Sequence, residues 1–294
     1  MNMRFHLHQT HHIVADFSAI AAGLKNATQT PGVHLFPELY LCGYPLADLC
    51  LQASFVHAYL KHLESVNAWT KSLAKDEDWV GLVGGLSYDL GADGVPLHIR
   101  NVIYELRAGH PLREVYTKRL LPNYDIFDEQ KYFSPGDKPG LWSWKDRTYA
   151  LLICEDMWGS TFHKLDPCLD LVALTPKPQG FAGVINLSAS PFDVTKQPRR
   201  IERAKVLSHL FKAPFFYVNR VGGEDEILFD GQSFVVNGDT TLGKAPAFEA
   251  NILTCDLPGT GQYDPPGPLL LDHTWESLFH PTFSQDPTLP KKLE

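Results

Sequence analysis

YALLICEDMW, at residues 149–158, joins an apolar run to a sudden group of reactive side chains. The run at residues 149–153 is short and continuously hydrophobic, as in a strand that is buried on both faces of a sheet. It stops at Cys154, and two carboxylates follow directly. Most free cysteines are small buried hydrophobes. That interpretation competes with a second one, in which the end of a core strand presents Cys154 to a cleft as a nucleophile.

Two other predicted strands end in a similar way. GVHLFPE, at residues 32–38, ends in Glu38, and EVYTK, at residues 114–118, ends in Lys118. Strand ends of an α/β sheet converge on the cleft in which such folds place their sites. We therefore expect Glu38, Lys118 and Cys154 to lie close together.

Glutamate, lysine and cysteine form a coherent chemical set for acyl transfer. The Lys118 ammonium can lower the pKa of an adjacent thiol, and with the backbone N–H of Glu155 it can stabilise an oxyanion. The Glu38 carboxylate can take the thiol proton and later activate water. These residues predict hydrolysis of an amide or a nitrile through a thioester, without a catalytic histidine.

The rest of the chain alternates between strand and helix patterns. Helices are predicted at residues 15–27, 55–74 and 197–212. Strands are predicted at residues 4–9, 79–86, 101–106, 141–144, 183–188, 215–219, 231–236 and 250–257, besides those already named. We find no linker or repeat, so we expect one α/β domain over residues 1–257, followed by a proline-rich extension over residues 258–294.

Composition excludes several classes of protein. The chain has 294 residues, 44% hydrophobic and 20% charged, as in an ordinary globular protein. Its net charge is −8 and both signs are mixed along the chain, so we expect neither nucleic acid nor an anionic membrane as a partner. No run approaches the ~18 apolar residues of a membrane span, and residues 1–12 lack the apolar core of a signal peptide.

The cysteines and histidines give no sign of a disulfide framework or a metal site. The five cysteines have neither a CxxC pair nor zinc-ligand spacing, which indicates reduced thiols in a cytoplasmic protein. His6 and His8 would share one face of the first strand, and a metal site there is the alternative. Since no carboxylate or cysteine cluster joins them at ligand spacing, we expect no metal and no cofactor.

Five motifs closely resemble the nitrilase (carbon–nitrogen hydrolase) superfamily, which is known for a Glu-Lys-Cys triad. They are FPELYLCGYPLADL at residues 36–49, KRLLPNYDIFDEQKYFSPGD at 118–137, LLICEDMW at 151–158, NLSASPF at 186–192 and GGEDEILFDGQSFVV at 222–236. More narrowly, the chain resembles the glutaminase domain of glutamine-dependent NAD synthetase over roughly residues 1–257. LPNYDIFDE and CEDMW are far more specific than the bare triad.

The resemblance implies an α-β-β-α sandwich that stacks with a second subunit into an αββα-αββα homodimer. It implies Glu38 as general base, Lys118 as oxyanion stabiliser and Cys154 as nucleophile, with Glu129 supporting Lys118 and the nucleophile. The residues that it implies for glutamine binding are Tyr44, Tyr124, Phe127, Glu155 and Ser188 or Ser190. These supply a carboxylate for the α-ammonium group, a hydroxyl for the α-carboxylate, and aromatic walls.

The chain also departs from the family pattern. The full synthetases carry an ATP-using domain with an SGGxDS-type loop, and VGGLSYD at residues 83–89 is not that loop. We therefore expect a free-standing subunit that does not make NAD by itself. Thr195-Lys196 replaces the usual Gly-Lys, and His6 and His8 replace small residues. These differences concern substrate details and partner contacts rather than the chemistry.

Three functions fit the sequence. The first is a glutaminase subunit that hydrolyses L-glutamine and passes ammonia to a separate NAD synthetase. The second is a stand-alone amidase that acts on another small amide. The third is a non-catalytic binding or regulatory subunit, against which the intact set of Glu38, Lys118, Glu129 and Cys154 argues.

Overall fold

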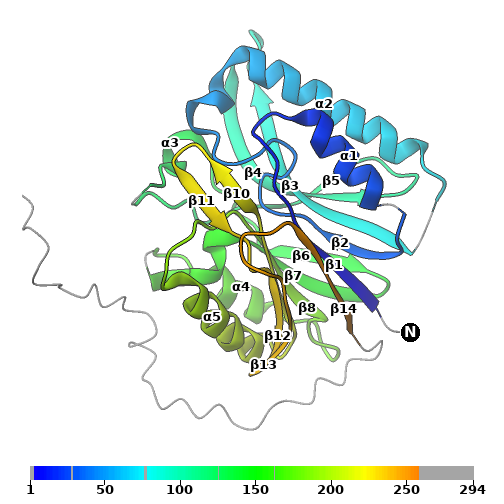
Figure 1. Cartoon of the computed structure of the whole chain (residues 1–294), viewed down its shortest axis with the longest axis vertical. Helices are drawn as coiled ribbons and strands as arrows, with labels where there is room; N and C mark the ends of the chain where they lie inside the picture. The colour runs from blue at the N-terminus through cyan, green and yellow to red at the C-terminus, as the bar shows by residue number, and fades with distance from the viewer. Residues whose placement is uncertain (1–2, 28, 76–77, 125, 162, 258–294) are drawn as a thin grey trace, which may run out of the picture.

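The computed structural model describes residues 3–27, 29–75, 78–124, 126–161 and 163–257. The predicted extension at residues 258–294 lies outside the described residues. Two six-stranded sheets lie face to face between two layers of helices (Figure 1). This α-β-β-α arrangement is the predicted fold class.

The first sheet, here sheet A, has the order β14-β1-β2-β3-β4-β5. Its three middle strands β1, β2 and β3 are parallel, and the remaining pairs are antiparallel. The strands are β1 (Met3–Gln9), β2 (Gly32–Leu35), β3 (Trp79–Leu90), β4 (Pro96–Arg107), β5 (Arg113–Thr117) and β14 (Asn251–Leu257).

The second sheet, here sheet B, has the order β13-β12-β9-β8-β7-β6, again with three parallel strands, β7, β8 and β9. Its other pairs are antiparallel. The strands are β6 (Gly140–Trp144), β7 (Arg147–Ile153), β8 (Gly183–Ser188), β9 (Phe215–Asn219), β12 (Phe234–Asn237) and β13 (Thr240–Lys244).

Helices cover the outer face of each sheet (Figure 1). Helices α1 (Phe17–Ala27) and α2 (Ala53–Ser72) pack on sheet A, whereas α4 (Pro167–Ala173) and α5 (Lys196–Phe211) pack on sheet B. The smaller elements are η1 (Ala47–Leu51), α3 (Glu129–Tyr132), η2 (Cys154–Thr161) and a hairpin of β10 (Val221–Glu224) and β11 (Ile227–Asp230).

Strand β7 confirms that residues 149–153 are buried on both faces. Tyr149, Leu151 and Ile153 face the layer between the sheets, while Ala150 and Leu152 face the layer under α4 and α5. Side chains of a strand alternate between its faces, so a central strand with helices outside and a sheet inside requires an unbroken apolar run.

Several predicted boundaries differ from those in the structure, and two of the differences have clear local reasons. Helix α1 begins at Phe17 rather than at residue 15, because Ala15 has φ +62° and the Asp16 carboxylate accepts from the Ala19 N–H at 3.0 Å as a cap. The strand predicted at residues 231–236 begins only at Phe234, since Gly231 and Gln232 have φ of 65° and 54°.

Helix α5 has basic residues near its N-terminus, where they oppose the helix dipole, so an acidic partner is expected nearby. The Arg200 guanidinium is fully buried and donates to both oxygens of Asp230 at 2.8 and 2.9 Å. The five cysteines form no disulfide. Among the described residues, no helix is both long and apolar enough to cross a membrane.

The inter-sheet layer predicts one stability result. Phe216 of β9 is fully buried, and its ring centroid lies 4.3 Å from that of Phe5 in β1. Phe216→Ala is expected to lower the free energy of unfolding by about 3–5 kcal/mol, because it opens a cavity between the sheets. Leu141→Ala, at a 43% exposed position of β6, is the control and should change it by less than about 0.5 kcal/mol. Urea denaturation measures both, and equal losses would contradict this assignment of the core.

Candidate active site

Three strand ends bring Glu38, Lys118 and Cys154 together. Glu38 lies just after β2 and Lys118 directly after β5, both in sheet A, whereas Cys154 directly follows β7 in sheet B. The sheets face each other, so the site is assembled from both of them. The structure thus brings Glu38 and Lys118 into contact at the edge of the inter-sheet layer, and the charges of both act on the Cys154 thiol.

The Lys118 side chain is the centre of this group. Only 1% of Lys118 is exposed, and its ammonium donates to Glu38 Oε1 at 2.7 Å and to Glu129 Oε1 and Oε2 at 2.9 and 2.7 Å. Burial works to lower the pKa of Lys118, but the charges of Glu129 and Glu38 outweigh it and raise that pKa well above its usual value. Lys118 is therefore a permanent cation.

The Glu38 carboxylate is fixed by donors from both sheets. Asn101 in β4 donates to Glu38 Oε1 at 2.7 Å, and the backbone N–H of Ala189, just after β8, donates to Oε2 at 2.9 Å. Together with Lys118, these donors orient both carboxylate oxygens. A base held in one orientation meets the first requirement of general base catalysis.

Cys154 occupies a strained turn at the end of β7. Its φ is +44°, in a region that residues other than glycine rarely adopt, and such strained turns commonly expose a nucleophile between a strand and a helix. Burial raises the pKa of the Cys154 thiol and the charge of Glu38 raises it further, which outweighs the opposing charge of Lys118. The expectation of a lowered pKa is thus wrong for this resting structure. The thiol keeps its proton until a base removes it.

Glu129, at the start of α3, is the second carboxylate that binds the Lys118 ammonium. Its carboxylate also accepts a hydrogen bond from the Tyr44 hydroxyl at 3.1 Å. Burial raises the pKa of Glu129 to about 7, against the opposing charge of Lys118. Tyr44, predicted to bind glutamine, thus lies beside Glu129 with its hydroxyl engaged there.

Three of the predicted substrate-binding residues form a group beside Cys154. The Tyr124 hydroxyl donates to Glu155 Oε2 at 2.8 Å, and the rings of Tyr124 and Phe127 meet edge to face at 5.8 Å between centroids. Glu155 is the residue after Cys154, and its charge acts on the pKa of Cys154. An anionic group flanked by aromatic rings is suited to an ammonium group.

The two candidate serines differ in their surroundings. Ser188 ends β8 and is fully buried, and its hydroxyl lies near that of Tyr217, whose pKa it lowers. Ser190 accepts from the Arg200 guanidinium at 3.1 Å through its hydroxyl and at 3.0 Å through its carbonyl. Ser188 is therefore the serine that Arg200 does not hold.

Comparisons with known proteins give relatives of the chain in sequence and in fold. No protein-family model matches the chain. The chain is 32% identical over 273 residues to the glutamine-dependent NAD(+) synthetase of Synechocystis sp., a match that covers 88% of this chain and 47% of the relative. It is 33% identical over 224 residues to that of Thermotoga maritima, with coverages of 76% and 35%. The chain spans about half the length of such relatives, or less.

Solved structures give the fold. A glutamine-dependent NAD+ synthetase from Acinetobacter baumannii matches with a TM-score of 0.73 and 26% identity, over 88% of this chain and 46% of that one. A nitrilase-superfamily amidase from Nesterenkonia AN1 matches with a TM-score of 0.67 and 23% identity, over 87% and 91%. The chain has the nitrilase-superfamily fold. In sequence it is homologous to glutamine-dependent NAD synthetases.

Two residues near the nitrilase-type centre were not predicted to belong to it. Asn101 is a fully buried polar residue inside the otherwise apolar part of β4, and its Oδ1 has no partner in the described structure. Lys196, the first residue of α5, is partly buried, and its charge acts on the pKa of Cys154. A lysine in the first turn of a helix opposes the helix dipole. That unfavourable position is the feature of the sequence that could have marked Lys196 as a site residue.

Burial lowers the pKa of Lys196, and the charges of Cys154 and Glu155 partly oppose that effect. The Lys196 ammonium lies 5.8 Å from the centroid of the Phe127 ring. The Lys196 cation and the Glu155 anion thus both lie on the Phe127 side of Cys154. This pairing of opposite charges suits a zwitterionic substrate.

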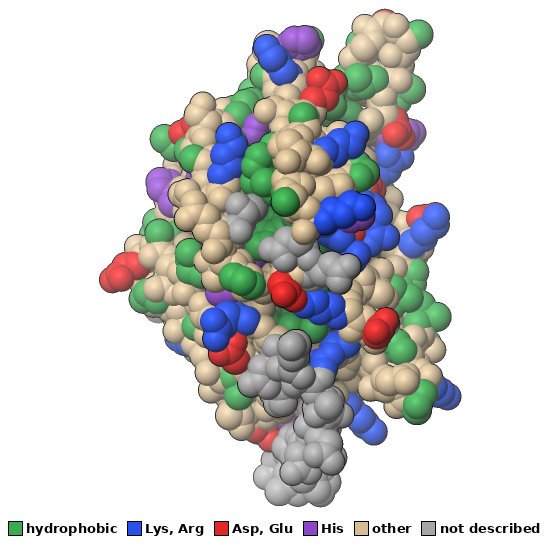
Figure 2. Space-filling view, turned by 90° about the vertical axis from the view of Figure 1, so that its right-hand side faces the viewer, with side chains coloured by type: hydrophobic (Ala, Val, Ile, Leu, Met, Phe, Trp, Pro, Cys, Tyr) green, Lys and Arg blue, Asp and Glu red, His purple; other side chains and the backbone are tan. Residues whose placement is uncertain are grey.

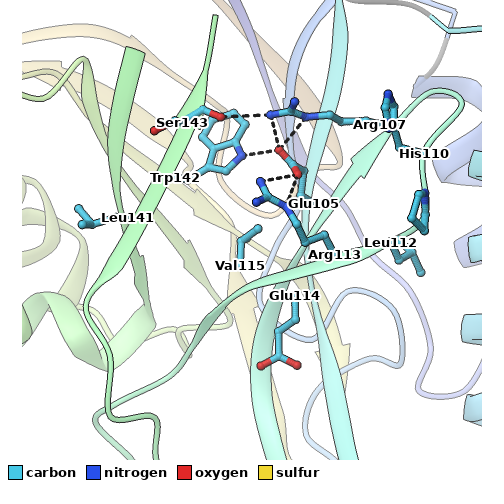
Figure 3. A pocket seen from close by; sticks show the side chains of 11 residues that line it. Glu105, Arg107, His110, Leu112, Arg113, Glu114, Val115, Leu141, Trp142 and Ser143 are labelled. Atoms are coloured by element: carbon cyan, nitrogen blue, oxygen red, sulfur yellow. Dashed lines mark hydrogen bonds and ion pairs between the residues drawn. The ribbon is translucent and has the colours of Figure 1, made fainter. Parts of the chain in front are cut away.

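A separate hollow of about 700 Å³ in this nitrilase fold contains none of these residues (Figure 3). At its base, Glu105 accepts from Arg107 and Arg113 at 2.8 Å each and from the Trp142 indole at 2.6 Å. Glu105, Arg107 and Arg113 therefore satisfy one another, and the bond from Glu105 to Trp142 joins β4 of sheet A to β6 of sheet B. On the face shown in Figure 2, acidic and basic side chains are interspersed.

The histidines of β1 lie apart from this site. His8 Nε2 and His34 Nδ1 are 2.9 Å apart, and the ring of His6 stacks on that of His34 at 4.5 Å. Burial lowers the pKa of His6, His8 and His34, so they are neutral core residues. Within the described residues, no group of three or more His, Cys, Asp or Glu side chains has the geometry of a metal site.

Removing the charge of Glu38 and removing that of Lys118 should shift the reactivity of Cys154 in opposite directions. The charge of Glu38 raises the pKa of Cys154 and that of Lys118 lowers it. In Glu38→Gln, the midpoint pH for alkylation of Cys154 by iodoacetamide should therefore fall by about one unit, a tenfold rise in the thiolate population below the midpoint. In Lys118→Met it should rise by a similar amount. Peptide mass spectrometry of the alkylated protein measures both, and shifts in the same direction would contradict this arrangement.

Proposed function

We propose that the chain is an amide C–N hydrolase that converts L-glutamine into glutamate and ammonia through a thioester on Cys154. The observation that supports this most is the buried ammonium of Lys118, held between Glu38 and Glu129 within electrostatic reach of the Cys154 thiol. A buried cation flanked by two carboxylates is costly to desolvate. Its presence therefore supports a role in chemistry rather than in stability.

In the acylation step, Glu38 takes the proton of the Cys154 thiol and the sulfur attacks the amide carbonyl carbon. The negative charge that develops on the carbonyl oxygen is stabilised by the Lys118 ammonium and the backbone N–H of Glu155. Protonated Glu38 then gives its proton to the departing nitrogen. The C–N bond breaks, ammonia leaves, and the acyl group remains on sulfur.

In the deacylation step, Glu38 is again a carboxylate and takes a proton from an incoming water molecule. The resulting hydroxide attacks the thioester carbonyl, the C–S bond breaks, and the thiol recovers its proton. The raised pKa of Cys154 fits this cycle, because the resting thiol hands its proton to Glu38 only when substrate is in place. Glu129 and Tyr44 keep Lys118 in position through both steps.

Recognition of glutamine follows from the charges around the nucleophile. We assign the α-ammonium group to Glu155, which Tyr124 orients, and the α-carboxylate to Lys196 with the hydroxyl of Ser188. Phe127 lies beside Lys196 and supplies an apolar wall. Charge-assisted contacts of this kind are each worth about 1.5–3 kcal/mol.

The names of the relatives suggest where the ammonia goes. Because they are glutamine-dependent NAD synthetases, we propose a separate ammonia-dependent NAD synthetase as partner. We also propose that the chain pairs with a second copy into the αββα-αββα homodimer. The alternative function is hydrolysis of another small amide without a synthetase, which the structural match to a nitrilase-superfamily amidase favours.

The deciding measurement is glutamate release from L-glutamine, with and without a separately expressed ammonia-dependent NAD synthetase. Cys154→Ala should lower release by roughly 10⁴-fold or more, as expected for loss of a covalent nucleophile. Cys255→Ala, in β14 away from the site, is the matched control and should retain activity. Release that increases with the synthetase supports the partnership. Retained activity in Cys154→Ala would refute the triad.

Substrate choice is tested by comparing glutamine with propionamide, which lacks the α-groups. Lys196→Met and Glu155→Gln should each raise KM for L-glutamine by about 10–100-fold, the equivalent of one charge-assisted contact. With propionamide only their effects on the pKa of Cys154 remain, which Lys196 lowers and Glu155 raises, so the kinetics should change much less than with L-glutamine. Equal losses on both substrates would exclude recognition of the amino acid by these residues and would favour the amidase alternative.

A further inference from the structure

One buried carboxylate lies beside the candidate site and has no part in the chemistry above. Asp156 is fully buried and accepts four hydrogen bonds. Its Oδ1 accepts from the backbone N–H groups of Arg119 and Leu120 at 3.2 and 2.8 Å. Its Oδ2 accepts from the backbone N–H of Ile153 at 3.0 Å and from the Tyr116 hydroxyl at 2.8 Å.

The two oxygens hold two different strand ends. Arg119 directly follows Lys118 at the end of β5, and Ile153 directly precedes Cys154 at the end of β7. Strand β5 is an edge strand of sheet A and β7 belongs to sheet B, and no backbone ladder joins them. Asp156 therefore links the segment that carries the ammonium to the segment that carries the thiol.

A carboxylate is the side chain that this position requires. All four partners donate, and an ionised carboxylate is the side chain that accepts on both of its ends. Burial raises the pKa of Asp156 to about 6, and hydrogen bonds from Ile153, Leu120 and Tyr116 limit the rise. At neutral pH the group is therefore ionised. An asparagine in its place would have to point its NH₂ group at a backbone donor. That donor would be the Ile153 N–H in one orientation of the amide and the Arg119 and Leu120 N–H groups in the other.

The strained backbone of Cys154 also needs support from its neighbours. A residue other than glycine at positive φ is strained and persists only where the surroundings hold it. The bond from the Ile153 N–H to Asp156 fixes the peptide between Leu152 and Ile153, one residue before Cys154. The same carboxylate thus holds the nucleophile turn and fixes its distance from Lys118.

We propose that Asp156 is a positioning residue that sets the separation between the Lys118 ammonium and the Cys154 sulfur by clasping both strand ends. The proposal rests on the proposed function for its consequence in catalysis. Its test does not, because the reactivity of Cys154 can be measured without any substrate.

The test is alkylation of Cys154 by iodoacetamide as a function of pH, in Asp156→Asn and in Tyr116→Phe as the matched control. Loss of the clasp lets Lys118 move away from the thiol, so alkylation at neutral pH should slow by about tenfold, equivalent to about one pH unit in midpoint. Removing a negative charge without any movement would speed alkylation, so the two effects have opposite signs. Tyr116→Phe keeps all three backbone bonds and should change the rate by less than about threefold.

A double-mutant cycle with Lys118→Met identifies the route of the effect. If Asp156 acts by placing Lys118, then Asp156→Asn should cause no further slowing in the Lys118→Met background. The proposal would be overturned if Asp156→Asn slowed alkylation as much in the Lys118→Met background as in the wild type. It would also be overturned if Tyr116→Phe slowed alkylation as much as Asp156→Asn does. Thermal unfolding of each variant checks the fold, and if Asp156→Asn does not fold, Asp156→Glu takes its place with an expected partial slowing. A protein that fails to hydrolyse glutamine but passes this test would refute only the proposed function.

Discussion

The structure depends on one buried cation, the Lys118 ammonium, which two carboxylates share. Removing three charges from water is expensive, and one ammonium cannot fully compensate Glu38 and Glu129 together. The pKa of Glu129, raised to about 7 by burial, reflects that imbalance. A core built only for stability would place hydrophobic side chains here. The fold instead carries the cost of the cluster and recovers it through the many apolar contacts between its sheets.

Because the sheets face each other rather than share a ladder, contacts between side chains and backbone must align them. Glu38 accepts from Ala189 across the layer, Asp156 binds the ends of β5 and β7, and Glu105 binds the indole of Trp142. All three contacts use a carboxylate on one segment and donors from the opposite sheet. The apolar layer brings the sheets together without direction, and these directional bonds fix how one sheet lies on the other.

The sequence was most informative where local chemistry decides the structure. An unbroken apolar run fixed β7, and reactive residues at strand ends located Glu38, Lys118 and Cys154 before any contact was known. The contacts of Asp156 could not be predicted from the sequence, because its backbone donors lie up to 37 positions away in the chain. A carboxylate beside a cysteine also resembles a catalytic acid. The β10–β11 hairpin was missed because VGGE lacks the alternation of a strand. The raised pKa of Cys154 could not be predicted, since burial and the distances to Glu38 and Lys118 are properties of the folded chain.

The pairing of β1 with β14 has a consequence for synthesis on the ribosome. Residues 3–9 bond to residues 251–257 along their whole length, so β1 must wait for a partner strand that is synthesised about 250 positions later. Closing so long a loop is slow and costs chain entropy. Until then, one side of β1 is an unpaired edge that could pair with another nascent chain. Sheet B, built from residues 140–244, has no such delay, and its completion first would give the late strand a surface on which to dock.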